Sequence, residues 1–508
     1  MAANKAALPI MIQGTHSDAG KSIIVTALCR IFAQDGHHTA PFKSQNMALN
    51  SYITLDGKEI GRSQGIQAEA AGVIATTDMN PILIKPTRDH EAQVVVHGKP
   101  LKNMEAKSYR SDYYETAKAI IQSSYENLAS SYERIVIEGA GSPAEVNLND
   151  RELVNMSIAK MADAPVVLVG DIDKGGVFAS LVGTLQLLSQ DERDRIIGVI
   201  INKFRGDLSL LEPGLTWFEE YTGKPVLGVI PFINDLGIEA EDSLSLNNYS
   251  IHKNQDKELD IAVIHYPRIS NFTDIDPLHY ETDCHVRLVE NVRQLEQPDV
   301  ILLPGSKNTI EDLMFLKERG LDQAILKAHQ NGAIIFGICG GYQMLGDLIE
   351  DPYQVESNTH EIKGLGLLPI HTILTKEKIT IRSKGTVEVS GEKLDVTGYE
   401  IHMGKTTCLT HVSPFIQLKE GVDGSKNQEE TCIGTYFHGI FHNDEFRWSF
   451  LKNIRWKKGL KPDILREAYE DRQENDFNRL AEEVRTAIDI SQLNQKIEQF
   501  AKRKRENR

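Results

Sequence analysis

The sequence predicts an α/β fold in which the first of two domains is a doubly wound parallel sheet covered by helices. Its 508 residues are too many for one ordinary hydrophobic core, so two or more domains are expected. Short apolar runs ending in Gly, Pro, Asn or Asp alternate with helical stretches through most of the chain. Such nearly continuous apolar strands are typical of a parallel sheet buried on both faces.

The apolar runs fall into two sets separated by a polar stretch. The first set predicts strands at Leu8–Gln13, Arg134–Glu138, Pro165–Asp171, Ile196–Asn202 and Val226–Pro231, and the second at Asp260–His265, Val300–Pro304 and Ala333–Gly337. From about Glu361 to Met403 the apolar residues are β-branched and widely spaced, which predicts further strands or hairpins. We therefore predict a first domain over 1–246, a linker over 247–258, a second domain over 259–450 and a charged helical extension over 451–508.

Composition and charge exclude several classes of protein. Hydrophobic residues make up 41% of the chain and charged residues 25%, as in folded proteins that are not disordered. The 56 basic residues are outnumbered by 72 acidic ones, which argues against a nucleic-acid or anionic-membrane surface over the whole protein. No signal peptide or membrane-spanning run is expected, and the cysteines lack metal or disulfide spacing. We expect a cytoplasmic protein, and the sequence leaves open whether it forms a homo-oligomer.

The first expected strand leads into a glycine-rich phosphate loop. Gly14, Thr15, Gly20, Lys21 and Ser22 follow the G-x-x-x-x-G-K-S pattern with one extra residue, and an apolar helix comes next. Glycines let the backbone approach phosphate oxygens, the N–H groups at the helix start face the anion, and the lysine contributes positive charge. The pattern predicts ATP binding, with Ser22 as a ligand of Mg²⁺. The alternative is an ordinary glycine-rich turn.

Three further residues at strand ends fit the same site. Glu138 closes a strand and opens a glycine-rich turn, where its carboxylate can bind Mg²⁺ directly or through water. Asn202 ends another strand, at the edge where ligands of open α/β sheets bind. Lys43 ends a further expected strand and can stabilise a transferring phosphoryl group. The alternatives are a helix-capping carboxylate for Glu138 and a surface lysine for Lys43.

A cysteine in the second domain occupies a strand-to-helix turn typical of a nucleophile. The strand before Gly337 runs into Cys339, which small residues and glycines surround. This turn exposes the sulfur at a helix N-terminus and favours the thiolate. The N–H of Gly340 can supply part of an oxyanion hole, and the glycine-rich turn at Gly305 can supply the rest. His438, late in the chain between small and apolar residues, is the expected base. The alternative is a structural histidine.

The Cys339 turn and His438 resemble the class I glutamine amidotransferases, whose cysteine forms a glutamyl thioester and releases ammonia. Most of that class carry a Glu two residues after the histidine, which orients the imidazole. Here that position is Ile440, as in the subgroup that acts on corrinoids, so what orients His438 is left open.

The first half resembles the dethiobiotin-synthetase-like branch of phosphate-loop proteins, and the whole chain is similar to the cobyric acid synthase family. The matching stretches include PFKSQNMALNSYITLDGKEIGRSQ, EGAGSPAEVNL, GDIDKGGVFASLVGT, PGSKNTIEDL and GYEIHMG. The resemblance implies amidation of the b, d, e and g carboxylates of adenosylcobyrinic acid a,c-diamide, a step of cobalamin biosynthesis. Each amide would consume one glutamine and one ATP. Contact of Met47–Ser63 with the corrinoid is expected from the resemblance alone.

Other interpretations keep part of this pattern. The related cobyrinic acid a,c-diamide synthases share both domains, although the stretch QNMALNSY favours the first family. A phosphate-loop switch ATPase would normally carry a second lysine early in the loop, where this chain reads Gly14-Thr15-His16. A scaffold with relic sites does not explain an intact Cys339 and His438.

Overall fold

The computed structural model describes residues 7–88, 91–234, 236–238, 254, 256–410 and 412–506. The chain divides into two compact units: Met1–Ala48, Lys58–Ile238 and Gln473–Arg508 form the first, and Leu49–Gly57 with Glu239–Arg472 form the second. Most of the predicted linker at 247–258 lies outside the described residues. The units also differ from the predicted domains in the placement of Leu49–Gly57 and of the C-terminal extension.

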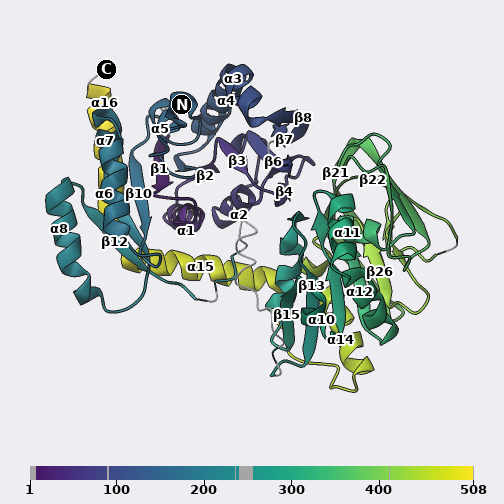
Figure 1. The fold of residues 1–508 in the computed structure, drawn as a ribbon. Helices are drawn as coiled ribbons and strands as arrows, with labels where there is room; N and C mark the ends of the chain where they lie inside the picture. The colour runs from purple at the N-terminus through teal and green to yellow at the C-terminus, as the bar shows by residue number, and fades with distance from the viewer. Residues whose placement is uncertain are drawn as a thin grey trace. The chain divides into compact units, whose positions relative to one another are not determined.

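The first unit is built on a six-stranded sheet in which every neighbouring pair is parallel (Figure 1). In spatial order its strands are β12 (Val226–Pro231), β11 (Ile196–Phe204), β10 (Val166–Asp171), β1 (Leu8–Gly14), β9 (Arg134–Glu138) and β2 (Thr39–Phe42). The parallel sheet and its five predicted strands are thus confirmed. Its helices are α1 (Lys21–Gln34), α2 (Arg62–Ala70), α3 (Ala106–Asp112), α4 (Tyr114–Ser131), α5 (Met156–Met161), α6 (Val177–Leu187), α7 (Gln190–Arg195) and α8 (Glu212–Thr222).

A smaller sheet in the same unit has no counterpart in the predicted strands. Its strands are β3 (Gln45–Met47), β6 (Ile82–Arg88), β7 (Glu91–Val96) and β8 (Lys99–Glu105), in that order. The buried residues Leu83, Val94 and Val95 anchor it. Their side chains alternate with charged and polar residues, so the strands are short and only half apolar.

The C-terminal helices pack against the first sheet. They are α15 (Tyr469–Ala487) and α16 (Ile490–Glu506), drawn in yellow in Figure 1. Phe477, Leu480 and Val484 recur at helical spacing and lie in the same hydrophobic cluster as the strand residues Ile10 and Val167. The predicted helical character of this region is confirmed, but Gln473–Arg508 belongs to the first unit and is no separate extension.

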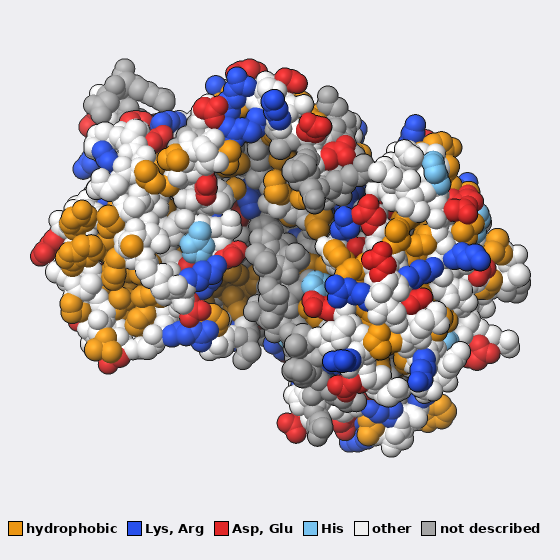
Figure 2. All heavy atoms as spheres, in the orientation of Figure 1, with side chains coloured by type: hydrophobic (Ala, Val, Ile, Leu, Met, Phe, Trp, Pro, Cys, Tyr) orange, Lys and Arg blue, Asp and Glu red, His pale blue; other side chains and the backbone are white. Residues whose placement is uncertain are grey.

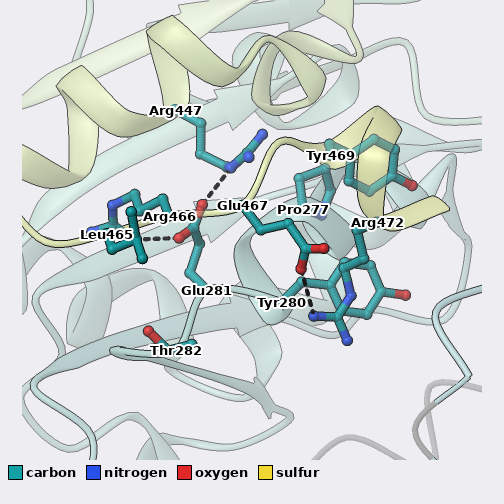
Figure 3. Close-up of a pocket in the computed structure, with 10 residues that line it drawn as sticks. All are labelled: Pro277, Tyr280, Glu281, Thr282, Arg447, Leu465, Arg466, Glu467, Tyr469 and Arg472. Carbon is teal, nitrogen blue, oxygen red and sulfur yellow. Dashed lines mark hydrogen bonds and ion pairs between the residues drawn. The ribbon is translucent and has the colours of Figure 1, made fainter. Parts of the chain in front are cut away.

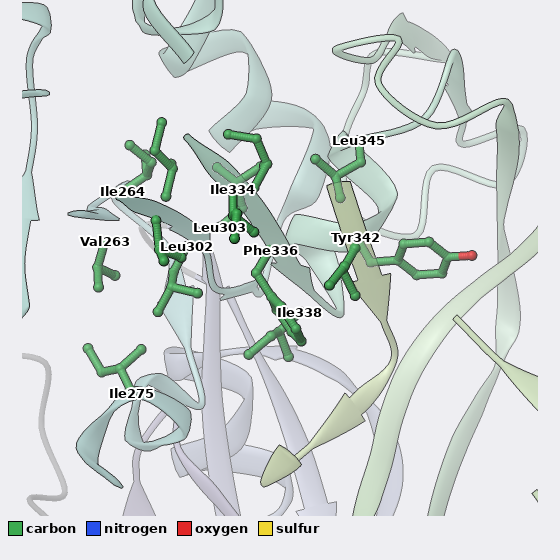
Figure 4. Packing of buried hydrophobic residues seen from close by; sticks show 14 of the residues in the cluster. Val263, Ile264, Ile275, Leu302, Leu303, Ile334, Phe336, Ile338, Tyr342 and Leu345 are labelled. Carbon is green, nitrogen blue, oxygen red and sulfur yellow. The ribbon is translucent and has the colours of Figure 1, made fainter. Parts of the chain in front are cut away.

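The second unit has its own six-stranded sheet. Its strands are, in order, β15 (Cys284–Val289), β13 (Leu259–Ile264), β16 (Val300–Leu303), β18 (Ile334–Ile338), β26 (Cys432–Thr435) and β25 (Ser425–Lys426), and the last pair is antiparallel. Helices α11 (Thr309–Glu318), α12 (Leu321–Gln330) and α14 (Asp444–Lys457) accompany it. Val263, Leu302 and Phe336 pack together in its core, as Figure 4 shows. The three strands predicted after the linker are confirmed.

A second, mostly antiparallel sheet completes this unit. It contains β20 (Glu361–Lys363), β19 (Leu348–Glu350), β21 (Ile370–Val389), β22 (Glu392–Cys408) and β27 (Phe437–His438), with β23 (Ile416–Leu418) and β24 (Val422–Asp423) at the side. The long hairpin of β21 and β22 confirms the additional strands expected between Glu361 and Met403. Because β27 pairs with β22, the hairpin reaches His438.

Exposed apolar side chains gather over α8, where Figure 2 shows a cluster of orange atoms. Trp217 and Tyr221 are about half exposed and stack with their ring centroids 5.2 Å apart, and Leu210 is 83% exposed. Exposed apolar patches often mark interaction surfaces. Self-association of this chain stays a prediction. Among the described helices, none combines the length and the apolar character needed to cross a bilayer.

Candidate functional site

The phosphate loop connects the end of β1 to the start of α1. Gly20 precedes α1 with φ +95°, a left-handed conformation that favours glycine. A Cβ atom at Gly20 would lie 2.1 Å from Asn202 Nδ2, so a side chain is also excluded by space. Asn202 Nδ2 donates a hydrogen bond to the carbonyl of Ala19 at 2.9 Å. The predicted Asn202 therefore braces the loop from the end of β11.

Lys21 and Thr15 fix the shape of this loop. Lys21 Nζ donates to the carbonyl oxygens of His16 and Ser17, each at 2.9 Å, and to that of Gly141 at 3.3 Å. The backbone N–H of Thr15 donates to Val169 of β10 at 2.9 Å. The lysine amine thus lies across the loop and reaches the turn after β9, where an anion held by the loop would meet it.

Glu138 is the centre of a buried polar cluster at the end of β9. Its Oε1 accepts hydrogen bonds from Ser22 Oγ at 2.8 Å and from Lys43 Nζ at 2.9 Å. Its Oε2 accepts from Gln67 Nε2 at 2.6 Å. Burial would raise the pKa of Glu138, but the charge of Lys43 and the three hydrogen bonds hold it below the ordinary value. The carboxylate is therefore ionised, and Lys43 is a buried partner of Glu138.

The oxygen atoms of Ser22 and Glu138 suit a hard divalent cation. Mg²⁺ prefers oxygen ligands and is usually held by one or two protein groups together with substrate phosphates. Ser22 Oγ and Glu138 Oε1 lie 2.8 Å apart beside the loop, so both can contribute to one coordination shell. The donor set therefore fits the predicted magnesium site.

Asp171 and Lys203 border the loop and were not among the predicted site residues. Lys203 Nζ donates to the carbonyl of Asp18 at 2.7 Å and to Asp171 Oδ2 at 2.8 Å. Both residues lie at the carboxyl ends of neighbouring strands, β10 and β11. The predicted strand ends placed them at this edge, but their pairing depends on the register of the two strands.

Cys339 lies at the turn between β18 and the short helix α13 (Gly340–Met344). Its φ of +51° is rare for a residue with a side chain, and such strain is typical of a nucleophile turn. The turn needs glycines, because a Cβ atom at Gly341 would lie 1.9 Å from the carbonyl oxygen of Leu303. The Cys339 thiol is 7% exposed and approaches the carbonyl of Ile401 at 3.6 Å. The predicted strained turn is present.

The predicted oxyanion residues lie beside this turn. Gly305 and Ser306 form the short strand β17, which pairs with β14 (Ile269–Ser270). A Cβ atom at Gly340 would lie 2.8 Å from the backbone nitrogen of Ser306, and one at Gly305 would lie 3.2 Å from His438 Cε1. The structure therefore brings Gly305, Gly340 and His438 together around Cys339.

Asp274 orients His438, which the sequence had left without a partner. Asp274 Oδ2 lies 2.6 Å from His438 Nδ1, and its Oδ1 accepts from the N–H of Gly439 at 2.7 Å. Both side chains are buried, and the imidazole stacks on Tyr399 at 5.1 Å between ring centroids. Ile440, at the position of the usual Glu, is fully buried among apolar residues. A carboxylate from another segment thus takes that place.

The electrostatic surroundings favour a protonated His438. Burial alone would lower its pKa, but the Asp274 carboxylate and then the Cys339 thiol raise it to about 10. Nε2 makes no other hydrogen bond to a residue that the structure describes. A protonated imidazole beside Cys339 stabilises a thiolate there.

No feature of the sequence singles out Asp274. It lies in the stretch NFTDID, with Asp276 two residues away and other acidic residues nearby. The 3₁₀ turn η5 (Phe272–Ile275) carries Asp274 to the turn η6 (Ile440–His442), 164 residues later in the chain. Only the packing of these two turns identifies the partner.

Asp312 supports the oxyanion strand and predicts a pH dependence of stability. It is fully buried on α11, and its Oδ2 accepts from Ser306 Oγ at 2.6 Å. Burial raises the pKa of Asp312 from 3.8 to about 7. The folded protein therefore binds this proton more tightly than the unfolded chain, and the free energy of unfolding falls as the pH rises across that interval.

Asp312→Asn should remove this dependence. We expect the decrease in unfolding free energy between pH 5 and pH 8 to be smaller than in the wild type by roughly 1–3 kcal/mol. Urea unfolding at both pH values measures it. Equal decreases in the two proteins would show that Asp312 does not titrate in this interval.

A pocket elsewhere in the second unit is lined by paired charges (Figure 3). Glu281 accepts from Arg447 Nε at 2.6 Å and is also paired with Arg466, while Arg472 lies 3.8 Å from Glu467. Because each arginine has a carboxylate partner, the pocket offers little excess positive charge to an anion.

The predicted site residues thus form two clusters. The first unit holds Gly14, Thr15, Gly20, Lys21, Ser22, Lys43, Glu138 and Asn202, and the second holds Cys339, His438, Gly305 and Gly340. The first cluster provides a lysine-bearing loop and an ionised carboxylate, as nucleotide binding requires. The second provides a cysteine, a histidine and a carboxylate in the order of a nucleophilic triad.

Comparison with known proteins identifies both units. Residues 10–246 match the CobQ/CobB/MinD/ParA nucleotide binding domain, and residues 260–446 match the CobB/CobQ-like glutamine amidotransferase domain. A solved structure described as a glutamine amidotransferase aligns with 39% of this chain and 99% of its own, with 16% identity and a TM-score of 0.30.

Curated relatives match nearly the whole length. A cobyric acid synthase of Geobacillus sp. strain WCH70 is 60% identical, over 98% of this chain and 99% of the relative. A cobyric acid synthase of Geobacillus kaustophilus strain HTA426 is 59% identical, over 97% and 98%. With this identity along both units, the chain belongs to the cobyric acid synthase family.

Proposed function

We propose that this protein uses ATP and glutamine to amidate the b, d, e and g carboxylates of adenosylcobyrinic acid a,c-diamide in the cytoplasm. The observation that carries the proposal is the 60% identity to a cobyric acid synthase over 98% of the chain. The two clusters supply the chemistry that such a reaction needs, namely activation of a carboxylate and release of ammonia.

The first cluster is suited to activating the carboxylate. A carboxylate resists attack by an amine, because its leaving group would be oxide. Transfer of the γ-phosphoryl group of ATP to a carboxylate oxygen gives an acyl phosphate and ADP, and ammonia then displaces phosphate to form the amide. Lys21 and Lys43 offset the negative charge that develops on the phosphoryl group. Mg²⁺, held by Ser22 and Glu138, would supply further charge neutralisation at the phosphates.

The second cluster is suited to releasing ammonia from glutamine. The Cys339 sulfur attacks the side-chain amide carbon, and the N–H groups of Gly305 and Gly340 stabilise the oxyanion. His438 holds the thiol proton and gives it to the departing ammonia. It then takes a proton from the water that hydrolyses the thioester, which leaves glutamate and the free thiol. Asp274 holds the imidazole in the tautomer that keeps Nε2 toward the sulfur.

Lys21→Ala should reduce amide formation from both nitrogen sources. Because activation of the carboxylate precedes attack by ammonia from either source, we expect the rate to fall by about 10²- to 10³-fold with glutamine and with ammonium chloride alike. Amide formation is followed by mass spectrometry. Lys160→Ala, an exposed lysine of the same unit paired with Glu192, is the matched control and should keep the wild-type rate. Loss of the glutamine-driven reaction alone would contradict the assigned role of Lys21.

Product analysis tests the proposed function itself. Purified protein is incubated with Mg-ATP, glutamine and adenosylcobyrinic acid a,c-diamide, and in parallel with cobyrinic acid. Stepwise gain of amides on the a,c-diamide supports the proposal. Amidation of cobyrinic acid that stops at the a,c-diamide would indicate the related a,c-diamide synthases instead. ATP hydrolysis without any amide product would favour a phosphate-loop switch ATPase.

A further inference from the structure

A short segment between two strands of the first unit belongs to the second unit. Leu49–Gly57 follows β3 and precedes β5 (Glu59–Gly61), and both of those strands lie in the first unit. The segment contains the short strand β4 (Ser51–Ile53). It therefore packs within the glutaminase unit while both of its ends continue into the nucleotide-binding unit.

Asn50 and Asn271 join this segment to the glutaminase fold by reciprocal hydrogen bonds. Asn271 Oδ1 accepts from the N–H of Ser51 at 3.0 Å, and Asn50 Oδ1 accepts from the N–H of Phe272 at 3.3 Å. Asn50 is 1% exposed and Asn271 is 4% exposed. Because each amide oxygen satisfies a buried N–H of the other segment, moving one segment without the other leaves buried polar groups unpaired.

The long hairpin holds the other end of the segment. Arg382 of β21 donates from Nε to the carbonyl oxygen of Ile53 at 2.8 Å. Its guanidinium lies 5.6 Å from the centroid of the Tyr52 ring. The segment is thus fixed at separate points, of which only the asparagine pair touches the turn that carries Asp274.

Asn271 directly precedes that turn. It adopts φ +51°, and its carbonyl accepts from the N–H of Asp274 at 3.2 Å. Asp274 in turn lies 2.6 Å from His438 Nδ1. A continuous series of hydrogen bonds therefore leads from Leu49–Gly57 through the turn to the imidazole.

We propose that the Asn50–Asn271 pair positions Asp274 and thereby lets the segment Leu49–Gly57 control glutamine hydrolysis. The inference rests on the proposed function, because the segment lies within Met47–Ser63, the range expected to contact the corrinoid. A corrinoid that binds more tightly when the pair is formed shifts the protein toward that conformation. Glutamine is then hydrolysed fastest when an acceptor for the ammonia is present.

Variants of the pair test this role. Asn50→Ala removes one acceptor, and Asn271→Gly removes the other while tolerating the positive φ. Asn427→Ala is the matched control: Asn427 accepts from the N–H groups of Thr431 and Cys432, each at 2.9 Å, in the same unit but away from Asp274. For each protein, kcat and KM for glutamate release are measured with and without Mg-ATP and corrinoid. Amidation driven by ammonium chloride is measured in the same preparations.

The expected result is a selective loss of glutaminase turnover. Asn50→Ala and Asn271→Gly should lower kcat for glutamine by about 10- to 100-fold and leave KM largely unchanged, since a misplaced catalytic group slows chemistry more than binding. Stimulation by corrinoid should disappear, and ammonia-driven amidation should stay at the wild-type rate. The double variant should be no worse than the poorer single one, because both changes break one contact.

Behaviour like that of Asn427→Ala, with stimulation by corrinoid retained, would overturn the inference. Failure of the proposed function is recognised separately, because the wild type would then form no amide from ammonium chloride. In that case an unchanged kcat of the two variants without corrinoid would still overturn the positioning role of the pair.

Discussion

Cys339→Ala is expected to abolish the use of glutamine and to preserve amidation from ammonia. Without the sulfur no thioester can form, so glutamate release should fall by at least about 10⁴-fold. The nucleotide cluster around Glu138 contains no residue of the cysteine turn, so carboxylate activation should continue. Glutamate release and amide formation are measured separately, with each nitrogen source in turn.

Cys432→Ala is the matched control for this experiment. Cys432 is fully buried on β26, the strand next to the one that leads into Cys339, and burial raises the pKa of its thiol to about 12. Its replacement tests the effect of losing a buried thiol close to the site. If Cys339→Ala lost ammonia-driven amidation as well while remaining folded, the division of labour between the clusters would be wrong.

Asp274→Asn is expected to slow glutamine hydrolysis by about 10²- to 10⁴-fold. An amide cannot stabilise the imidazolium and can hold the wrong tautomer of His438. The carboxylate raises the pKa of His438 to about 10, so the wild-type imidazole keeps its proton until the pH approaches that value. Without the carboxylate that pKa falls, and the alkaline limb of the activity profile should move to lower pH.

A pH profile of glutamate release distinguishes this role from a structural one. Loss of rate with an unmoved alkaline limb would show that Asp274 does not set the pKa of His438. Amidation from ammonia is the internal control for folding, because Asp274 lies in the glutaminase unit. Wild-type turnover in Asp274→Asn would exclude it from the triad.

The sequence was sufficient for the sheets and for the residues that carry local patterns. The strand from Arg134 to Glu138 is apolar throughout, so its burial and its polar end could be predicted without knowing its neighbours. Cys339 and Lys21 lie in turns whose glycines are required by backbone conformation, and those glycines are adjacent in the chain. Such features depend on short stretches of sequence.

Features that depend on distant contacts could not be predicted in this way. Asp274 is one acid among many in its stretch, and only the packing of η5 against η6 brings it to His438. The charged appearance of the last residues concealed the apolar stripe of Phe477, Leu480 and Val484, which had no evident partner until the first sheet was seen. The segment Leu49–Gly57 has no periodicity that assigns it to the second unit.

The stoichiometry of the complete reaction tests the central claim most directly. Amides on the corrinoid, ADP and glutamate are quantified together during one time course with the wild-type protein. The proposed joint action of the two clusters predicts one ADP and one glutamate for every amide, until all four target carboxylates are converted. Amide formation that consumed no ATP, or that proceeded from glutamine without release of glutamate, would contradict it.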